Sequence, residues 1–188
     1  MYNENIMRIL DLGCGKRRQP DSIGVDVNPD SDADVIADLD RSPYPFADNS
    51  FDQIYCDGII EHLTDVVAVM EELHRIAKPG ARIIIITPYF TSVDAFSDPT
   101  HKHYFSARSF DYFTNDFPEY SFYSSEARFA KRKVEISFWS LPRLGGIHPQ
   151  HLLGARWLAH RLTSIYERFF AYLLPAQSIR FELEAVKS

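Results

Sequence analysis

Apolar runs separated by polar turns predict alternating strands and helices in the first half of the chain. Five runs rich in apolar and β-branched residues are expected to be strands, at 8–12, 22–27, 35–38, 51–56 and 82–87. Before the last run, apolar residues recur at the spacing of one helix face, at Val66, Val69, Met70, Leu73 and Ile76. We expect Pro79 and Gly80 to end this helix. The run 82–87 is apolar throughout, which is typical of a central strand in a parallel sheet.

The second half of the chain predicts one more helix, two strands and a long amphipathic segment. A helix is expected over 106–117 and a strand within 127–139. Apolar and polar residues alternate over 179–186, as in a closing strand. Between these two strands, residues 140–175 form an insertion with one long helix at about 150–174.

The connection between the first two strands is unusually short. A parallel crossover with its helix needs at least roughly ten to twelve residues. The segment from Leu12 to Ile23 barely reaches that length and contains Pro20. The first helix is therefore expected to be a single turn or missing, which leaves one face of the sheet partly open.

The inserted helix has an apolar stripe made of Leu158, Leu162, Ile165, Phe169 and Tyr172. Packing is the commonest explanation of such a stripe, and the open face beside the short first connection is one place for it. We then expect Leu162→Glu or Phe169→Glu to destabilise the fold or break a dimer. A substrate cap, a homodimer interface and a membrane-surface anchor are the other interpretations.

The turn after the first strand, Gly13-Cys-Gly15, is the strongest sign of a ligand site. Glycines have no β-carbon, so a ligand can lie against the backbone. The next strand ends in Asp26, at the carboxyl edge where open parallel sheets bind ligands, and its carboxylate suits the paired hydroxyls of a ribose. A dinucleotide turn would have a third glycine and an acid roughly twenty residues further on. Lys16-Arg-Arg18 lacks that glycine and Asp26 comes sooner, so S-adenosylmethionine fits better.

The order of several short motifs over about residues 7–112 resembles the class I methyltransferases of the type 11 kind. The motifs are Asp11-Leu-Gly-Cys-Gly15, Gly24-Val-Asp26, Ala37-Asp-Leu39, Glu61-His-Leu63 and Arg75-Ile-Ala-Lys-Pro-Gly80. The resemblance implies an α/β fold, a three-layer Rossmann-like sheet of seven strands whose last strand is antiparallel. It also implies S-adenosylmethionine as the cofactor.

The same resemblance implies roles for residues near the strand ends. Asp38 would meet the adenine amino group and Leu39 would pack beside the ring, although Asp38 and Asp40 can also be explained as loop caps. The full set of expected cofactor-binding residues is Asp11, Gly13, Cys14, Gly15, Asp26, Asp38, Leu39 and Asp57.

The loop after the 82–87 strand carries the candidate catalytic residues His101, His103 and Asp94. Histidine titrates near neutral pH and can take the proton of an attacking hydroxyl. His101 is the preferred base. The alternatives are a cation bound by the two histidines with Asp94 or Asp98, and a purely structural role in shaping the loop. The loop loosely resembles those of methyltransferases from surface-glycan pathways.

Composition and charge indicate which binding partners and which cellular compartment to expect. The net charge of -6 argues against nucleic acid as the main partner. Cys14 and Cys56 are too few and too far apart for a disulfide framework or a zinc site, so a reduced, cytoplasmic setting is expected, with no metal. We see neither a signal peptide nor a membrane-spanning run and expect no stable membrane insertion.

The sequence therefore predicts a single methyltransferase domain over residues 1–188 that acts on a small-molecule acceptor. A hydroxyl of a sugar or related metabolite, free or carrier-linked, is the preferred acceptor. A lipid or lipid-linked acceptor is the first alternative. A protein that binds S-adenosylmethionine without turnover is the second.

Overall fold

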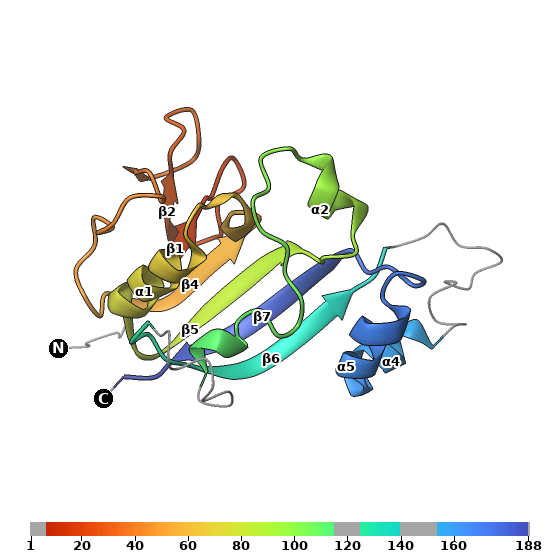
Figure 1. The fold of residues 1–188 in the computed structure, drawn as a ribbon. Coiled ribbons are helices and arrows are strands. Elements are labelled where there is room, and N and C mark those ends of the chain that lie inside the picture. The colour runs from red at the N-terminus through yellow and green to blue at the C-terminus, as the bar shows by residue number, and fades with distance from the viewer. Residues whose placement is uncertain (1–6, 115–124, 140–153, 188) are drawn as a thin grey trace.

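The structure is a computed structural model that describes residues 7–114, 125–139 and 154–187. Its centre is a seven-stranded sheet with the strand order β3-β2-β1-β4-β5-β7-β6 (Figure 1). The strands are β1 (Ile9–Leu12), β2 (Ser22–Asp26), β3 (Val35–Ile36), β4 (Phe51–Asp57), β5 (Ala77–Pro88), β6 (Phe129–Ser137) and β7 (Ser178–Ala185). The predicted α/β fold class is confirmed, and each predicted strand overlaps an observed one.

Strand direction fixes where the functional loops emerge. The pairs from β3 to β5 are all parallel, whereas β7 runs antiparallel to both of its neighbours, β5 and β6. Strand β6 therefore points the same way as β5. The carboxyl ends of β1, β2, β4, β5 and β6 meet at one edge, which is where ligands bind in open α/β sheets.

Helix α1 (Val66–Ile76) covers one face of the sheet (Figure 1). The five apolar positions predicted for its inner face are all buried or half-buried. Its start is capped by Asp65, whose side chain accepts the N–H of Ala68 at 3.0 Å. After its last residue the chain extends at once into β5, so Pro79 and Gly80 lie in the strand and do not end the helix. The β4–β5 register shifts near these two residues.

No helix lies between β1 and β2, whose connecting residues 13–21 are all described. The predicted loss of the first helix is confirmed. The side chain of Arg18 lies there instead, with its Cδ 2.7 Å from where a β-carbon on Gly24 would be. The same side chain forms an ion pair with Asp34 at 2.5 Å.

The helix predicted over 106–117 is wrong within the described residues, and 115–117 lie outside them. Only a 3-10 turn, η2 (Asp111–Phe113), forms there. The N–H of Ser106 donates to the side chain of Ser109 at 2.9 Å, and such side-chain bonds compete with helical ones. Phe110 is buried and its ring meets that of Phe181 edge-on at 4.7 Å. Packing on the sheet therefore overrides the helical pattern.

Over its described residues, 154–175, the inserted segment consists of three short helical pieces and not of one long helix. They are α4 (Ala155–Arg161), α5 (Thr163–Ile165) and the π-helical turn η4 (Tyr166–Phe170). Leu162 leaves the helical conformation, with φ at -132° and ψ at 52°, and so breaks the predicted helix. The predicted start at 150–153 lies outside the described residues.

This segment packs beside β6, at the opposite end of the sheet from β1 and β2 (Figure 1). Ala159 and Tyr166 are buried, and the ring of Tyr166 lies 5.9 Å from that of Phe138. The expectation that the segment covers the open face beside the first connection was therefore wrong. Most of the predicted inner stripe is exposed, at Leu162, Ile165, Phe169 and Tyr172. The break at Leu162 turns Tyr166 inward and the stripe outward.

Candidate functional site

Two adjoining pockets lie at the carboxyl edge of the sheet and share Gly13. One, of about 580 Å³, lies between the turn after β1 and the end of β4. The other, of about 200 Å³, lies between the ends of β2 and β3 and the segment after β4. All eight residues predicted to bind the cofactor line one or both pockets.

The glycine turn makes the passage between the pockets. Gly13 and Gly15 have φ values of 66° and 52°, a region that favours glycine. The N–H of Gly13 donates to the carbonyl of Val25 at 2.8 Å, which holds the turn against β2. A β-carbon on Gly13 would lie 2.6 Å from the side chain of Ile59. Cys14 is buried in the wall, and burial raises the pKa of its thiol, which stays uncharged.

Asp26 is fixed in place at the end of β2. One carboxylate oxygen accepts the N–H of Gly15 at 2.9 Å, and the other accepts the N–H of Asn28 at 2.8 Å. Each oxygen keeps a further lone pair for a ligand. An oriented carboxylate with spare acceptor capacity suits a pair of hydroxyls.

Asp11 and Asp57 give the larger pocket a negative wall. Asp11 is only 3% exposed at the end of β1, and its carboxylate accepts the N–H of Gln19 at 2.8 Å. Burial raises the pKa of the Asp11 carboxyl and the charge of Asp57 adds to the rise, while the Gln19 bond and Arg18 oppose it. Two carboxyl groups in one pocket favour a cationic ligand group.

The second pocket has one apolar and two acidic residues from the β3 loop. Leu39 is buried, whereas Asp38 is exposed and pairs with Arg41 at 3.0 Å. Asp40 has a structural role, because it accepts the N–H of Thr64 at 2.6 Å and contacts the ammonium of Lys102 at 3.3 Å. These bonds support the loop-cap interpretation for Asp40.

The loop after β5 overhangs this edge as predicted, and its backbone is fastened to the segment after β4. The N–H groups of Lys102 and His103 donate to the carbonyl of Glu61 at 2.8 and 3.3 Å. The ring of His101 lies 4.6 Å from that of His62, centroid to centroid. The loop therefore places His101 beside His62, which lines the smaller of the two pockets.

The three predicted catalytic residues do not form one cluster. His103 faces the backbone carbonyl of Thr64, 3.2 Å from its Nε2 atom, and Asp94 lies in the first turn of α2 (Val93–Ser97). Among the described residues, Glu61, His62 and His101 form a cluster in which one carboxylate oxygen and two imidazole nitrogens lie close enough to bind one metal ion. Sequence reasoning had not assigned Glu61 a role. Its position directly after a strand end, next to a histidine, was the available signal.

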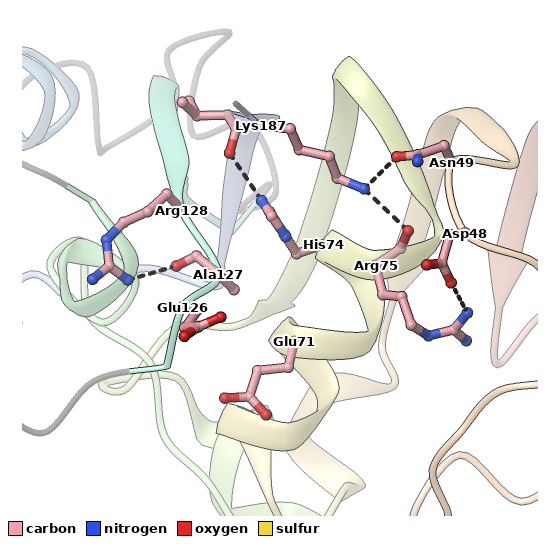
Figure 2. A pocket seen from close by; sticks show the side chains of 10 residues that line it. Asp48, Asn49, Glu71, His74, Arg75, Glu126, Ala127, Arg128 and Lys187 are labelled. Atoms are coloured by element: carbon pink, nitrogen blue, oxygen red, sulfur yellow. Dashed lines mark hydrogen bonds and ion pairs between the residues drawn. The ribbon is translucent and has the colours of Figure 1, made fainter.

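A larger cavity, of about 840 Å³, lies at the opposite edge of the sheet (Figure 2). Several of its polar groups bind one another (Figure 2). The ammonium of Lys187 bonds to the side chain of Asn49 and the carbonyl of Arg75 at 2.6 and 3.0 Å, and His74 Nε2 lies 2.9 Å from the carbonyl of Val186. These bonds fasten the end of β7 to the end of α1. We therefore assign this cavity a structural role.

Strand order, the reversed β7 and the glycine turn facing an acid define the class I S-adenosylmethionine-dependent methyltransferase fold. Residues 10–85 match the family model described as a methyltransferase domain. In the part of the chain that the structure describes, no helix is long and apolar enough to cross a membrane.

Two curated relatives and one solved structure agree with this class. The chain is 36% identical to demethylmenaquinone methyltransferase of Paenarthrobacter aurescens over 39% of its own length and 24% of that protein. It is 28% identical to the chloroplastic tocopherol O-methyltransferase of Arabidopsis thaliana, over 45% of its length and 31% of that protein. The chain thus spans about a quarter to a third of the length of these relatives. A SAM-dependent methyltransferase from Archaeoglobus fulgidus has the same fold, with a TM-score of 0.59, 20% identity, and coverage of 97% of this chain and 88% of that one.

Proposed function

We propose that the protein transfers a methyl group from S-adenosylmethionine to a hydroxyl of a small-molecule acceptor, preferably a sugar or related metabolite. One observation carries this proposal. All eight residues expected for the cofactor line two pockets that meet at Gly13, beside the histidine-bearing loop.

The residues that line the pockets support binding of that cofactor. Asp26 would hold the ribose hydroxyls, and Asp38 and Leu39 would hold the adenine. Asp11 and Asp57 would face the ammonium group of the methionine half, since a carboxylate is the natural partner of an amine. The close approach of Ile59 to Gly13 leaves no room for a β-carbon there, so only glycine fits this turn.

His101 is the proposed proton acceptor. Its Nδ1 lies 3.0 Å from the carbonyl of Ala95, which can only accept, so Nδ1 carries the proton and Nε2 keeps a lone pair. As the acceptor oxygen bonds to the methyl carbon and the carbon–sulfur bond breaks, the hydroxyl proton would pass to that lone pair. His103 and Asp94, on the same loop, would contact the acceptor.

A lipid or lipid-linked acceptor is the second candidate, favoured by the exposed surface of the inserted segment. The exposed large apolar side chains in its described part are Trp157, Leu162, Ile165, Phe169, Phe170, Tyr172 and Leu173. The exposed charges among the same described residues are Arg156, Arg161 and Arg168. The one acid of the segment, Glu167, is turned inward toward Tyr89. Apolar side chains among arginines suit an anionic lipid surface, and the two relatives are named for demethylmenaquinone and tocopherol.

Methyl transfer with a labelled cofactor tests these candidates. The protein would be incubated with S-adenosylmethionine labelled in its methyl group and two acceptor panels, one of free and nucleotide-linked sugars and one of lipid-linked hydroxyls in vesicles. Label in the first panel supports the preferred acceptor, and label confined to the second supports the lipid candidate. If calorimetry shows that S-adenosylhomocysteine binds but neither panel is methylated, the protein is better described as one that binds the cofactor without turnover. No binding would overturn the proposal.

A further inference from the structure

Glu61, His62 and His101 bring three metal-ligand atoms together beside the proposed cofactor pocket. One carboxylate oxygen and one ring nitrogen from each histidine all lie within 4.8 Å of one another. Glu61 and His62 come from the 3-10 turn η1 (Ile60–His62) after β4, and His101 comes from the loop after α2. Two separate segments therefore converge on one point.

One oxygen of the Glu61 carboxylate has no partner. Glu61 is 2% exposed, and its Oε2 atom accepts no hydrogen bond. None of the ion pairs within the described ranges includes this residue. A buried carboxyl group with an unbonded oxygen and no ion-pair partner is costly, and a bound cation would remove that cost.

Both histidines are held in the tautomer that a metal needs. The Nδ1 of His101 must donate to the carbonyl of Ala95, because that oxygen can only accept. The hydroxyl of Thr100 donates to the carboxylate of Asp98 at 2.6 Å, so its oxygen accepts from Nδ1 of His62 at 2.9 Å. Each Nε2 atom therefore keeps its lone pair. A metal-bound histidine normally donates its other ring N–H to an oxygen in this way.

We propose that Glu61, His62 and His101 bind a divalent transition metal, with Zn²⁺ as the best match to two imidazoles and one carboxylate. Three protein ligands leave positions open for a ligand oxygen, as in catalytic zinc sites. The sequence favoured no metal, and the cation site considered as an alternative there used His103 and Asp94 or Asp98, which are not part of this donor set.

The role of this metal rests on the proposed methyl transfer. A metal in the open site would bind the acceptor hydroxyl and lower its pKa, so that the proton is released to solvent and the oxygen attacks as an alkoxide. His101 would then be a ligand and not the base. The binding site itself does not depend on which acceptor is methylated.

Cobalt titration of the metal-free full-length chain tests the site. Co²⁺ replaces Zn²⁺ in such sites and gives visible absorption when bound by nitrogen ligands. We expect one equivalent to bind the wild type and to be displaced by Zn²⁺. Glu61→Gln and His101→Gln should each weaken binding by at least about tenfold, since even outer-shell partners are typically worth that much. The matched control is His160→Gln, an exposed histidine of α4 outside the cluster, which should bind as the wild type does.

Three results would overturn the site: no cobalt spectrum, equal binding in both variants and wild type, or an equal loss in the control. Far-UV circular dichroism of the same samples reports whether each variant is folded, and S-adenosylhomocysteine binding tests the proposed function separately. His101 is half-buried, so His101→Gln keeps the test valid if Glu61→Gln does not fold. If the wild type binds the cofactor but not cobalt, only the metal site is disproved. If it binds cobalt but not the cofactor, only the proposed function is disproved.

Discussion

The hydroxyl of Tyr89 donates a hydrogen bond to the carboxylate of Glu167 at 2.9 Å, and the same oxygen accepts the N–H of Ala107 at 2.7 Å. Glu167 thus ties both ends of the loop after β5 to the inserted segment. Burial raises the pKa of Tyr89, as does the neighbouring charge of Glu167, so the hydroxyl remains a donor at neutral pH. The loop that overhangs the site is therefore held from a part of the chain far along in sequence.

Removing that carboxylate should loosen the loop and lower stability. Hydrogen bonds to a charged group are worth roughly 1.5 to 3 kcal/mol, so we expect Glu167→Ala to cost about 2 kcal/mol in urea unfolding. Arg168→Ala, at the exposed neighbouring position, is the control and should change the free energy of unfolding by less than about 0.5 kcal/mol. Equal stability of the two variants would show that the tie contributes nothing.

Asp26→Ala should weaken cofactor binding by about ten- to a hundredfold, the loss of one charge-assisted hydrogen bond. The measurement is calorimetric titration with S-adenosylhomocysteine. Asp30→Ala removes the same charge from an exposed position outside both pockets and should bind as the wild type does. A wild-type affinity in Asp26→Ala, or binding of NAD in place of the adenosyl compound, would contradict the assignment.

Cofactor affinity should depend on pH through Asp11. Its carboxyl has a pKa raised above 3.8, mainly by burial, so protons bind to it at a higher pH than to an ordinary aspartate. The charged form is the one that attracts an ammonium group. Affinity should therefore be full at neutral pH and fall as the pH drops through the raised pKa.

Asp11→Asn is the matched test of that dependence. The variant should bind S-adenosylhomocysteine more weakly at neutral pH and should lose the part of the pH dependence that comes from this carboxyl. Calorimetry at several pH values, from neutral down to the lowest pH at which the protein stays folded, measures both effects. An unchanged pH profile in the variant would assign the dependence to another group.

His101→Ala should leave S-adenosylhomocysteine affinity nearly intact while slowing methyl transfer by about a hundredfold or more, which is the usual contribution of a general base. Loss of the proposed metal ligand would also slow the reaction, so the two roles are separated by adding Zn²⁺ to chelator-treated wild type. Activity that requires the added metal assigns His101 as a ligand. If chelation does not change the activity of the wild type, His101 is assigned as the base. If the His101→Ala variant keeps its activity, His101 is neither the base nor a required metal ligand.

The lipid candidate predicts that Phe169→Glu leaves the fold intact and abolishes binding to anionic vesicles, whereas the preferred sugar acceptor predicts little flotation of the wild type. Phe169 is 64% exposed, so the substitution removes little packing, contrary to the destabilisation expected from the sequence pattern. Flotation with vesicles rich in anionic lipid measures binding, and Val93→Glu, at an exposed apolar site of α2, is the control. Absence of wild-type flotation would exclude the lipid surface, and a shift from dimer to monomer in light scattering would assign the stripe to self-association.

The sequence alone determined the sheet and the edge where the two pockets lie, because both depend on local signals. Strand runs such as 51–56 and 82–87 are apolar enough to be buried in any arrangement, and α1 follows from a regular 3.6-residue repeat. Gly13 and Asp26 could be identified as candidate ligand-binding residues, because a glycine turn and an acid at the carboxyl ends of neighbouring strands are typical of a ligand site. Even the missing first helix could be predicted from chain length, since the connection is too short to hold one.

Only the tertiary structure decided which residues meet across the chain. The predicted stripe of the inserted segment became exposed because the break at Leu162 rotates the residues after it, a backbone change that periodicity does not encode. His101 was separated from His103 and joined to Glu61 and His62 because the loop is fastened through the carbonyl of Glu61. Contacts of this kind depend on where two distant loops cross the sheet edge, and residue type and spacing carry no information on that.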